Sequence, residues 1–490
     1  MGRMREGCTF FRGCGGLPQR VGVSHRIREN SFHKMYLQLW VVAVLGIWSL
    51  RAQDMKMDCD GDQVLQIIPQ NTEHVYCLQQ ICQSSQLDLW KPLQPEDITV
   101  GRAVHVRIPY IALRSVKEDL RHCSLSFQLL LDNVTQFMGN EKGRRRSKRS
   151  ITTYEYTKYH PMEDIYNWMN LVSESHSELV TQHHLGSTYE RRPMHYLKIS
   201  KSSNDPMKAK KMIWMDCGIH AREWIAPAFC QWFVREFVQN HRKDSRMQKI
   251  LKNLDLYILP VLNIDGYVYT WTTDRLWRKS RSKHYDDACY GVDLNRNFDT
   301  KWCTSGSSTN CTSNLYCGIS PVSEPETRAV VDFVASRKSD IICYLTMHSY
   351  SQYILTAYGY TQDLPKSYNE TVKVAQKAAS ELKKTHGTEY KVGSFANLLY
   401  EASGTSQDWV HDLGINFSFT IELRDNGTYK FVLPEDQIQP TCEETMAAVM
   451  TIIEYVNDKY FPNKASTTFT PHPAALLLYM VLALALLVEL

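Results

Sequence analysis

The stretch from Met215 to Pro227, which reads M-D-C-G-I-H-A-R-E-W-I-A-P, constrains this chain more than any other. His220 and Glu223 are three residues apart, where the apolar run Lys211 to Asp216 meets the start of a predicted helix. Their side chains can therefore converge on one metal ion. An imidazole and a carboxylate suit Zn²⁺, and catalytic zinc sites usually take three protein ligands. His348, which follows another strand-like run, is the best candidate for the third ligand.

The H-x-x-E spacing alone is weak evidence, because a solvated helix start produces it often. The composition provides further evidence, because it indicates a secreted protein. The 490 residues allow more than one domain, and a net charge of +4 is too small to indicate a nucleic-acid-binding protein. Fourteen cysteines are many for a cytosolic enzyme. Five sequons that can accept N-linked glycans point the same way, at Asn133, Asn310, Asn369, Asn416 and Asn426.

Residues 1–52 form a predicted signal region. The apolar run Leu37 to Leu50 has signal-peptide length and is followed by Arg51 and Ala52, where a signal peptidase can cut. A membrane anchor is the alternative, but it needs about 20 apolar residues. The basic segment before Met35 is long for a signal peptide, so Met35 is an alternative translation start.

Residues 53–149 are predicted to form a small α/β domain. It ends in G-R-R-R-S-K-R-S, a solvated linker between domains. In a secreted chain the run Arg146 to Arg149 also matches the cleavage site of furin-like proteases, which predicts processing after Arg149. The strand-like or mixed runs are Val64 to Pro69, Tyr76 to Ser85, Arg102 to Pro109 and Leu125 to Leu131.

Residues 150–460 are predicted to form the main α/β domain, because apolar strand-like runs alternate with helix-like segments. The expected strands are Lys211 to Asp216, Leu256 to Asn263, Ile341 to Met347 and Asn416 to Leu423. The expected helices are Trp224 to Gln239, Pro325 to Arg337, Thr371 to Lys384 and Glu443 to Asn457.

Residues 461–490 have the pattern of a glycolipid-anchor signal. Small residues that can accept the anchor, Asn463, Ala465 and Ser466, are followed by a polar spacer and then by the apolar run Ala474 to Val488. This order predicts attachment to the outer face of the plasma membrane. A short transmembrane tail is the alternative.

Several motifs occur together in the main domain: G-I-H-A-R-E-W-I-A-P-A, D-R-L-W-R-K-S-R-S, G-V-D-L-N-R-N-F, S-E-P-E-T, M-H-S-Y-S-Q and F-T-I-E-L-R-D-N-G-T-Y. In this order the chain resembles the zinc metallocarboxypeptidases of the pancreatic A/B type, and its anchor signal makes the carboxypeptidase O subfamily the most similar. The resemblance implies an α/β fold, with a mixed sheet covered by helices on both faces and a small α/β inhibitory prosegment in front. It also implies a zymogen that, once activated, releases single C-terminal residues from peptides and proteins.

The resemblance assigns the catalytic residues. One zinc ion is held by His220, Glu223 and His348, and Asp293 is the carboxylate that orients the first histidine. Glu422 is the general base, because a carboxylate can take a proton from water whose pKa the metal lowers. Arg278 matches the residue that polarises the scissile carbonyl and stabilises the oxyanion.

The resemblance also assigns a clamp for the substrate's free carboxylate, which an exopeptidase must recognise. The clamp residues carried over are Asn295, Arg296 and the mobile Tyr400, with Arg222 lining the approach. A guanidinium binds a carboxylate through two parallel hydrogen bonds, a geometry that an internal peptide cannot reproduce.

In this family the residue before D-W lies at the base of the side-chain pocket, and here it is Gln407. Its amide carries no charge but has donors and an acceptor. A buried Lys or Arg of the substrate would lack a counter-ion. We therefore expect polar and acidic C-terminal residues, Glu or Gln foremost, with some tolerance of apolar ones. The presumed remainder of the pocket is mostly apolar: Leu355, Gly359, Phe395, Ala402 and Thr420.

The family suggests three disulfide bonds, although spacing alone leaves other connectivities open. Cys343 lies in a strand-like run and is expected to be a small buried apolar residue. The partners of Cys59, Cys77, Cys82, Cys123 and Cys442 stay open. The suggested pairs are Cys217 with Cys230, Cys289 with Cys311, and Cys303 with Cys317.

Three other interpretations of the function fit the sequence less well. A catalytically inactive, membrane-anchored peptide-binding protein would lack a ligand or the base, and all are present. A zincin endoprotease would show H-E-x-x-H on a helix, and this sequence has no such motif. An adhesion protein on the same fold would leave the carboxylate clamp unexplained.

Overall fold

The computed structural model describes residues 61–85, 87–134, 154–202, 209–284 and 289–462. The predicted signal region, Cys59, the cleavage site after Arg149 and the anchor segment from residue 463 onward lie outside these residues. Over the described part of the chain, no helix has both the length and the apolar character needed to cross a membrane.

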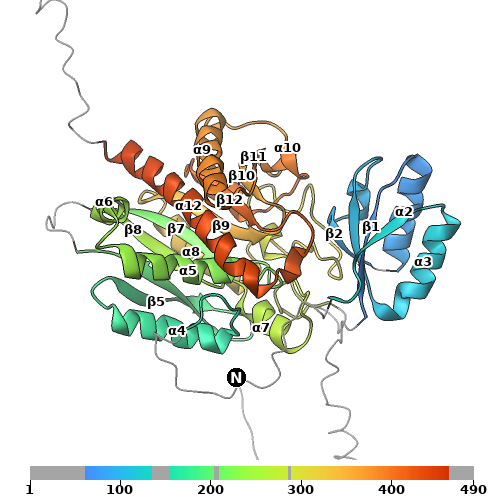
Figure 1. Ribbon diagram of the computed structural model, residues 1–490, viewed down its shortest axis with the longest axis horizontal. Helices are drawn as coiled ribbons and strands as arrows, with labels where there is room; N and C mark the ends of the chain where they lie inside the picture. Colours follow the sequence, from blue (N-terminus) through green and yellow to red (C-terminus); the bar gives the residue numbers. More distant parts are fainter. Residues whose placement is uncertain (1–60, 86, 135–153, 203–208, 285–288, 463–490) are drawn as a thin grey trace, which may run out of the picture. The chain divides into compact units, whose positions relative to one another are not determined.

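The N-terminal domain is a four-stranded antiparallel sheet in the order β2-β3-β1-β4. Figure 1 shows helices α2 and α3 on one face of this sheet, with which they share an apolar core. The segment predicted as mixed is helical because the Asn71 side chain caps α2 by accepting a hydrogen bond from the backbone N–H of His74 at 2.8 Å. The elements are β1 (Gln63–Ile67), α2 (Thr72–Ser84), β2 (Asp88–Lys91), β3 (Val104–Ile108), α3 (Leu113–His122) and β4 (Phe127–Leu131).

The main domain is built on an eight-stranded mixed sheet in the order β11-β10-β12-β9-β7-β8-β6-β5. The central strands β12, β9, β7 and β8 are mutually parallel, and antiparallel pairing occurs toward both edges. The strands are β5 (Val180–Ser187), β6 (Pro193–Ile199), β7 (Lys211–Cys217), β8 (Leu254–Leu259), β9 (Ile341–Ser349), β10 (Tyr353–Thr356), β11 (Lys391–Ser394) and β12 (Ser418–Leu423).

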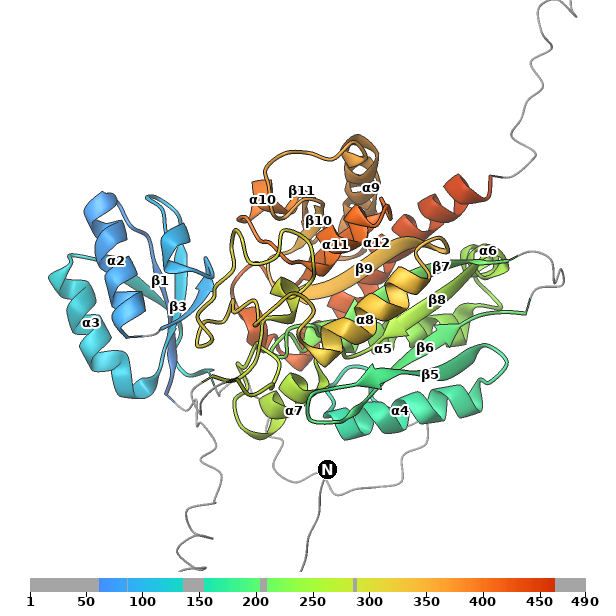
Figure 2. The same cartoon turned by 180° about the vertical axis from the view of Figure 1, so that it is seen from behind.

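Helices cover both faces of this sheet, as the family resemblance implies. Successive residues of a strand point to opposite faces. In β7, Ile213 and Met215 therefore belong to one buried cluster and Met212 and Trp214 to the other. Figure 1 shows α5 and α12 over the first face, and Figure 2 shows α8 and α11 over the second. The helices are α4 (Met162–Ser175), α5 (Ile225–Asn240), α6 (Ser245–Asn253), α7 (Ile264–Thr272), α8 (Pro325–Ser336), α9 (Tyr368–His386), α10 (Phe395–Leu398), α11 (Ser406–Asp412) and α12 (Ile438–Tyr460).

The sequence-based boundaries differ most at the start of α12, which begins at Ile438 and not at Glu443, and at the end of β8. The expected strand extended to Asn263, but β8 ends at Leu259 because Pro260 has no N–H to donate to a strand ladder. Asn263 instead caps α7 by accepting a hydrogen bond from the N–H of Gly266 at 3.0 Å. The strands β5, β6, β10 and β11 were missed; β5 is rich in polar residues, and β10 and β11 have only four residues each.

Four disulfide bonds join cysteines of the described residues. Three are the pairs that the family suggests, Cys217–Cys230, Cys289–Cys311 and Cys303–Cys317. The fourth, Cys77–Cys123, links α2 to the end of α3. The sequence alone did not identify the partners of these two cysteines. Within the described part of the chain, the free cysteines Cys82, Cys343 and Cys442 are all buried.

Candidate active site

Three adjacent parallel strands bring the predicted metal ligands and base together. In the register of the sheet, Glu422 of β12 lies directly opposite His348 of β9. The chain leaves β7 at Gly218, whose φ of +67° favours glycine, and turns toward the same edge with His220 and Glu223. A Cβ on Gly218 would lie only 3.0 Å from a ring carbon of Pro227 in α5. The site thus forms at the carboxyl ends of parallel strands, where ligands bind in open α/β sheets.

His220, Glu223 and His348 are buried and form a three-residue cluster, with one potential ligand atom from each lying within 4.8 Å of the others. The Nδ1 atoms of the two histidines are 3.2 Å apart. The Glu223 carboxylate approaches both nitrogens, at 2.8 Å from that of His220 and 3.2 Å from that of His348.

The arrangement of this cluster fits a zinc ion. Two nitrogens that each lie 2.0–2.1 Å from a tetrahedral zinc are about 3.3 Å apart, close to the separation observed here. Burial, and then the positive charge of Arg278, lower the pKa of His220, which keeps this imidazole in the neutral form that binds metals. Neutral imidazoles with one carboxylate are a common donor set of catalytic zinc sites.

The outward nitrogens of the two histidines have partners that set the ring orientations. His220 Nε2 lies 3.1 Å from the Asp293 carboxylate. His348 Nε2 lies 3.3 Å from the Thr346 hydroxyl, which donates to Asp216 at 2.7 Å. Such partners fix the tautomer and direct the free ring nitrogen toward the metal.

Arg278 is held beside the cluster by Asp293. Its Nε and Nη2 donate to one oxygen of Asp293 at 3.1 and 2.8 Å, while its Nη1 lies 3.9 Å from Glu223. Burial alone would raise the pKa of Asp293, but Arg278 and then His220 hold it well below its usual value. Asp293 is therefore ionised and orients both a histidine and an arginine.

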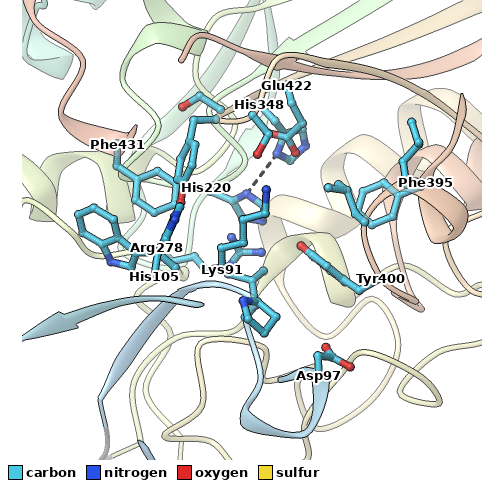
Figure 3. Close-up of a pocket in the computed structure, with 18 of the residues that line it drawn as sticks. Lys91, Asp97, His105, His220, Arg278, His348, Phe395, Tyr400, Glu422 and Phe431 are labelled. Carbon is cyan, nitrogen blue, oxygen red and sulfur yellow. Dashed lines mark hydrogen bonds between the residues drawn. The ribbon is translucent and has the colours of Figure 1, made fainter. Parts of the chain in front are cut away.

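The residues expected to form the carboxylate clamp line a cavity that the metal cluster also lines. Arg296 is buried and uses two of its nitrogens to donate to the carbonyls of Gly306 and Asn295, at 2.6 and 2.8 Å. Its Nη2 has no hydrogen-bond partner among the described residues. Tyr400 lines the cavity, and Figure 3 shows its hydroxyl directed into it. A buried guanidinium with an uncommitted donor is suited to an incoming carboxylate.

A cavity of about 360 Å³ joins these groups to the N-terminal domain. Lys91 at the end of β2 lines the cavity and interacts electrostatically with Glu422, and Figure 3 shows its side chain directed toward His220 and Glu422. Asp97 also lines the cavity and interacts with Arg296. The N-terminal domain thus presents a cation to the predicted base and an anion to the predicted clamp.

Two predicted substrate-binding residues do not line this cavity. Arg222 is fully buried, and its Nη1 donates to both carboxylate oxygens of Asp88 at 3.2 and 3.3 Å. Its guanidinium stacks on Phe431, 4.0 Å from the ring centre. Gln407 is 1% exposed and is bonded inside the main domain.

Sequence reasoning missed the residues of the N-terminal domain that line the cavity, among them Lys91, Asp97 and His105. Nothing in W-K-P distinguishes Lys91 from a surface lysine, because the charge is placed by the docking of two domains distant in sequence. The Nδ1 of His105 lies 3.4 Å from the Tyr350 hydroxyl, and burial lowers the pKa of His105 to about 3, so its ring is neutral.

Comparison with known proteins supports the same family. Residues 65–141 match the model of the carboxypeptidase activation peptide, and residues 165–448 match that of zinc carboxypeptidases. Carboxypeptidase O of Bos taurus is 61% identical over 311 residues, which cover 64% of this chain and 82% of that protein. Carboxypeptidase B of Bos taurus is 42% identical over 397 residues, which cover 81% of this chain and 94% of that protein.

Among solved structures, that of thrombin activatable fibrinolysis inhibitor is similar over 81% of this chain and 98% of its own, with 41% sequence identity and a TM-score of 0.77. The match of the family model covers more than half of the chain and contains the buried His-Glu-His cluster. The chain therefore belongs to the zinc carboxypeptidase family, a family of zinc-binding hydrolases, and it carries the activation peptide of a zymogen.

Proposed function

We propose that the cavity is the active site of an exopeptidase that releases single C-terminal residues from peptides and proteins. The observation that carries the proposal is the joint presence on one cavity of a buried His-Glu-His cluster, a carboxylate beside it and a buried arginine with an uncommitted donor. The cluster and the carboxylate beside it can activate water, and the arginine can bind a free carboxylate.

In this proposal His220, Glu223 and His348 hold one zinc ion. When bound, the ion would supply a water of lowered pKa and would polarise the scissile carbonyl. Glu422 is proposed to take up a proton from the attacking water and to give it to the leaving amine. Desolvation raises the pKa of Glu422 to about 8, close to the pH at which a group can both accept and return a proton.

Arg278 is proposed to stabilise the oxyanion. Its contact with Asp293 leaves Nη1 directed toward the cluster, so a fixed positive charge faces the position where negative charge develops. Arg296, Asn295 and Tyr400 are proposed to bind the terminal carboxylate. Arg222 is proposed to line the approach for the rest of the peptide once its partner Asp88 has left with the prosegment.

The N-terminal domain is proposed to be an inhibitory prosegment that is removed by cleavage after Arg149 by a furin-like protease. The support is the R-S-K-R run and the charged residues that this domain brings to the cavity, among them Lys91 and Asp97 of opposite sign. In cells, Arg149→Ala should leave a longer species without activity. Full activity of this uncut variant would contradict the proposal.

We further propose that the protein travels through the secretory pathway to the outer face of the plasma membrane. Four sequon asparagines, Asn310, Asn369, Asn416 and Asn426, are exposed, while Asn133 is partly buried.

A glycolipid anchor at Asn463, Ala465 or Ser466 is proposed from the C-terminal pattern. A phospholipase that cuts glycolipid anchors should release the enzyme, and removing residues 474–490 should make it secreted and active. Resistance of a full-length, detergent-extracted chain would favour a transmembrane tail.

Substrate preference is proposed to exclude basic residues. Gln407 carries no charge, and Thr420 and Leu355 around it offer no anion to a substrate ammonium. Neutral C-terminal residues are proposed to be accepted instead.

The deciding experiment is a release assay with the activated enzyme on peptides that differ only in their last residue, with and without a zinc chelator. Release of the last residue that stops with the chelator and returns with added zinc supports the proposal. An inactive peptide-binding protein would bind these peptides without releasing any residue. A peptide with an amidated C-terminus is the control, because it lacks the carboxylate that Arg296 is proposed to bind.

A further inference from the structure

Five of the six residues of the predicted side-chain pocket do not line the catalytic cavity. Of its presumed residues, Phe395 is the one that lines the cavity of the described structure, together with its neighbours Leu398, Leu399 and Tyr400. The others are buried and are not part of the lining: Leu355, Gly359, Ala402, Gln407 and Thr420.

Phe395 lines the cavity and also packs against these residues. It is the first residue of α10, directly after β11, and is 5% exposed. A Cβ on Gly359 would lie 3.5 Å from a ring carbon of Phe395, so the ring packs on the Gly359 backbone. Phe395 also belongs to one apolar cluster with Leu355 and Ala402.

The ring of Phe395 is supported on its cavity side by Tyr400. The two rings meet edge to face, with centres 5.6 Å apart. Figure 3 shows both rings at one side of the cavity, with Phe431 and His105 at the other. Because Phe395 is packed on both sides, its ring is a fixed wall of the cavity.

Gln407, behind this wall, is committed to the protein's own hydrogen bonds. Its Nε2 lies 3.2 Å from the carbonyl oxygen of Leu355 and 3.5 Å from that of Ser418. Its Oε1 accepts a hydrogen bond from the Thr420 hydroxyl at 2.6 Å. The amide therefore has no free donor that an acidic side chain could use.

We propose that Phe395 sets the depth of the pocket for the C-terminal side chain and restricts the enzyme to small residues such as Ala, Ser, Thr and Val. This inference rests on the proposed carboxypeptidase function and deepens it. With Phe395 in place, the C-terminal side chain of a substrate cannot reach Gln407. The amide of Gln407 therefore does not influence which residue is accepted.

The main test measures kcat/KM of the activated enzyme on peptides ending in Ala, Val, Leu, Gln, Glu or Lys. Because apolar pockets discriminate by about 10–200-fold per methylene, the wild type should favour Ala and Val over Leu, Gln and Glu by about 10-fold or more. Phe395→Ala should raise the ratio of kcat/KM for Leu or Gln to that for Ala by about 10-fold or more. Phe395→Leu, which preserves more of the packing, should give an intermediate result.

Val392→Ala is the matched control. Val392 lies in the adjoining β11 and packs against the main core, so its truncation removes apolar volume without opening the pocket. Its size preference should equal that of the wild type. A control that broadens the preference as much as Phe395→Ala would show that general loosening, and not pocket depth, is responsible.

A double-mutant comparison tests whether Phe395 hides Gln407. Gln407→Arg alone should change the ratio of Glu to Gln release by less than about 3-fold, whereas in the Phe395→Ala background the same change should raise it about 10-fold or more. If Gln407→Arg does not fold, the Phe395 series decides the question by itself.

The inference is overturned if the activated wild type releases Leu or Glu as fast as Ala, or if Gln407→Arg alone produces a strong preference for Glu. These outcomes can be distinguished from failure of the proposed carboxypeptidase function. In that case the activated wild type would release no residue from any of the peptides.

Discussion

The two ends of the active-site region are built differently. At the metal end, His220, Asp293 and Arg278 are charged or polar groups, each held by a partner within 3.1 Å. At the side-chain end, Phe395 is a neutral ring held by packing, and Gln407 is satisfied by its own surroundings. His220 and Arg278 of the metal end line the cavity, whereas at the side-chain end Phe395 lines it and Gln407 does not.

This difference separates two ways of using buried side chains. A buried ion costs free energy unless it is paired, so the metal end needs particular residue types in particular places. A buried apolar ring needs only volume of the right shape. Substitutions at the metal end should therefore act on chemistry or metal binding, and those at the side-chain end on which substrate is accepted.

The largest expected effect is at Glu422. Glu422→Gln removes the proposed base, so kcat should fall by at least about 10²-fold while zinc content, measured by metal analysis, stays that of the wild type. His348→Ala is the contrasting variant and should lose both metal and activity. A Glu422→Gln enzyme with reduced zinc and unchanged turnover would show that base and ligand have been exchanged.

Asp293→Asn should have the next largest effect, and it acts through another residue. Zinc affinity, measured by competition with a chelator, should fall about 10–100-fold because the amide no longer holds His220 with a charged hydrogen bond. Thr346→Val, which removes the longer contact to His348, should weaken binding less. Equal losses in the two variants would contradict the ranking of these partners.

Lys91→Ala tests whether charge at the metal end helps the prosegment to inhibit. In the uncut Arg149→Ala background, loss of the ammonium beside Glu422 should increase residual activity by about 3- to 10-fold, the size expected of one charged contact. Lys117→Ala in α3 is the control on the prosegment, because this residue does not line the cavity. Similar activity in both variants would show that Lys91 has no particular role.

The smallest expected effect concerns Glu326, a buried acid that has no cationic partner among the described residues. Burial raises its pKa from 4.5 to about 8, and its Oε2 has no hydrogen-bond partner in the described structure. Between pH 4.5 and 8 the unfolded chain releases this proton while the folded protein keeps it, so the group's contribution to stability falls as pH rises. Paired Asp293, whose pKa is lowered, has the opposite dependence.

Glu326→Gln should therefore raise the thermal unfolding midpoint relative to the wild type by a difference that grows from pH 5 to pH 8. Glu174→Gln, a change at an exposed acid in α4, is the control. A midpoint difference that is the same at every pH would mean that Glu326 is ionised in the folded protein.

Much of the fold was predictable from local pattern. The central strands β7, β9 and β12 are continuous apolar runs, because parallel strands buried on both faces require them. The edge strand β5 escaped prediction because its exposed side carries polar residues. The end of β8 was misplaced because Val261 and Leu262 continue its apolar pattern beyond Pro260, where the ladder ends.

The sequence by itself determined the chemistry of the metal end. Few residue types bind zinc or transfer a proton, so H-x-x-E, a later histidine and T-I-E-L-R-D carry their meaning without coordinates. Only the tertiary structure decided that Lys91 reaches Glu422 and that Phe395 stands between the cavity and Gln407. Both depend on which side chain occupies a space shared by segments distant in sequence, and packing of that kind leaves no local pattern to read.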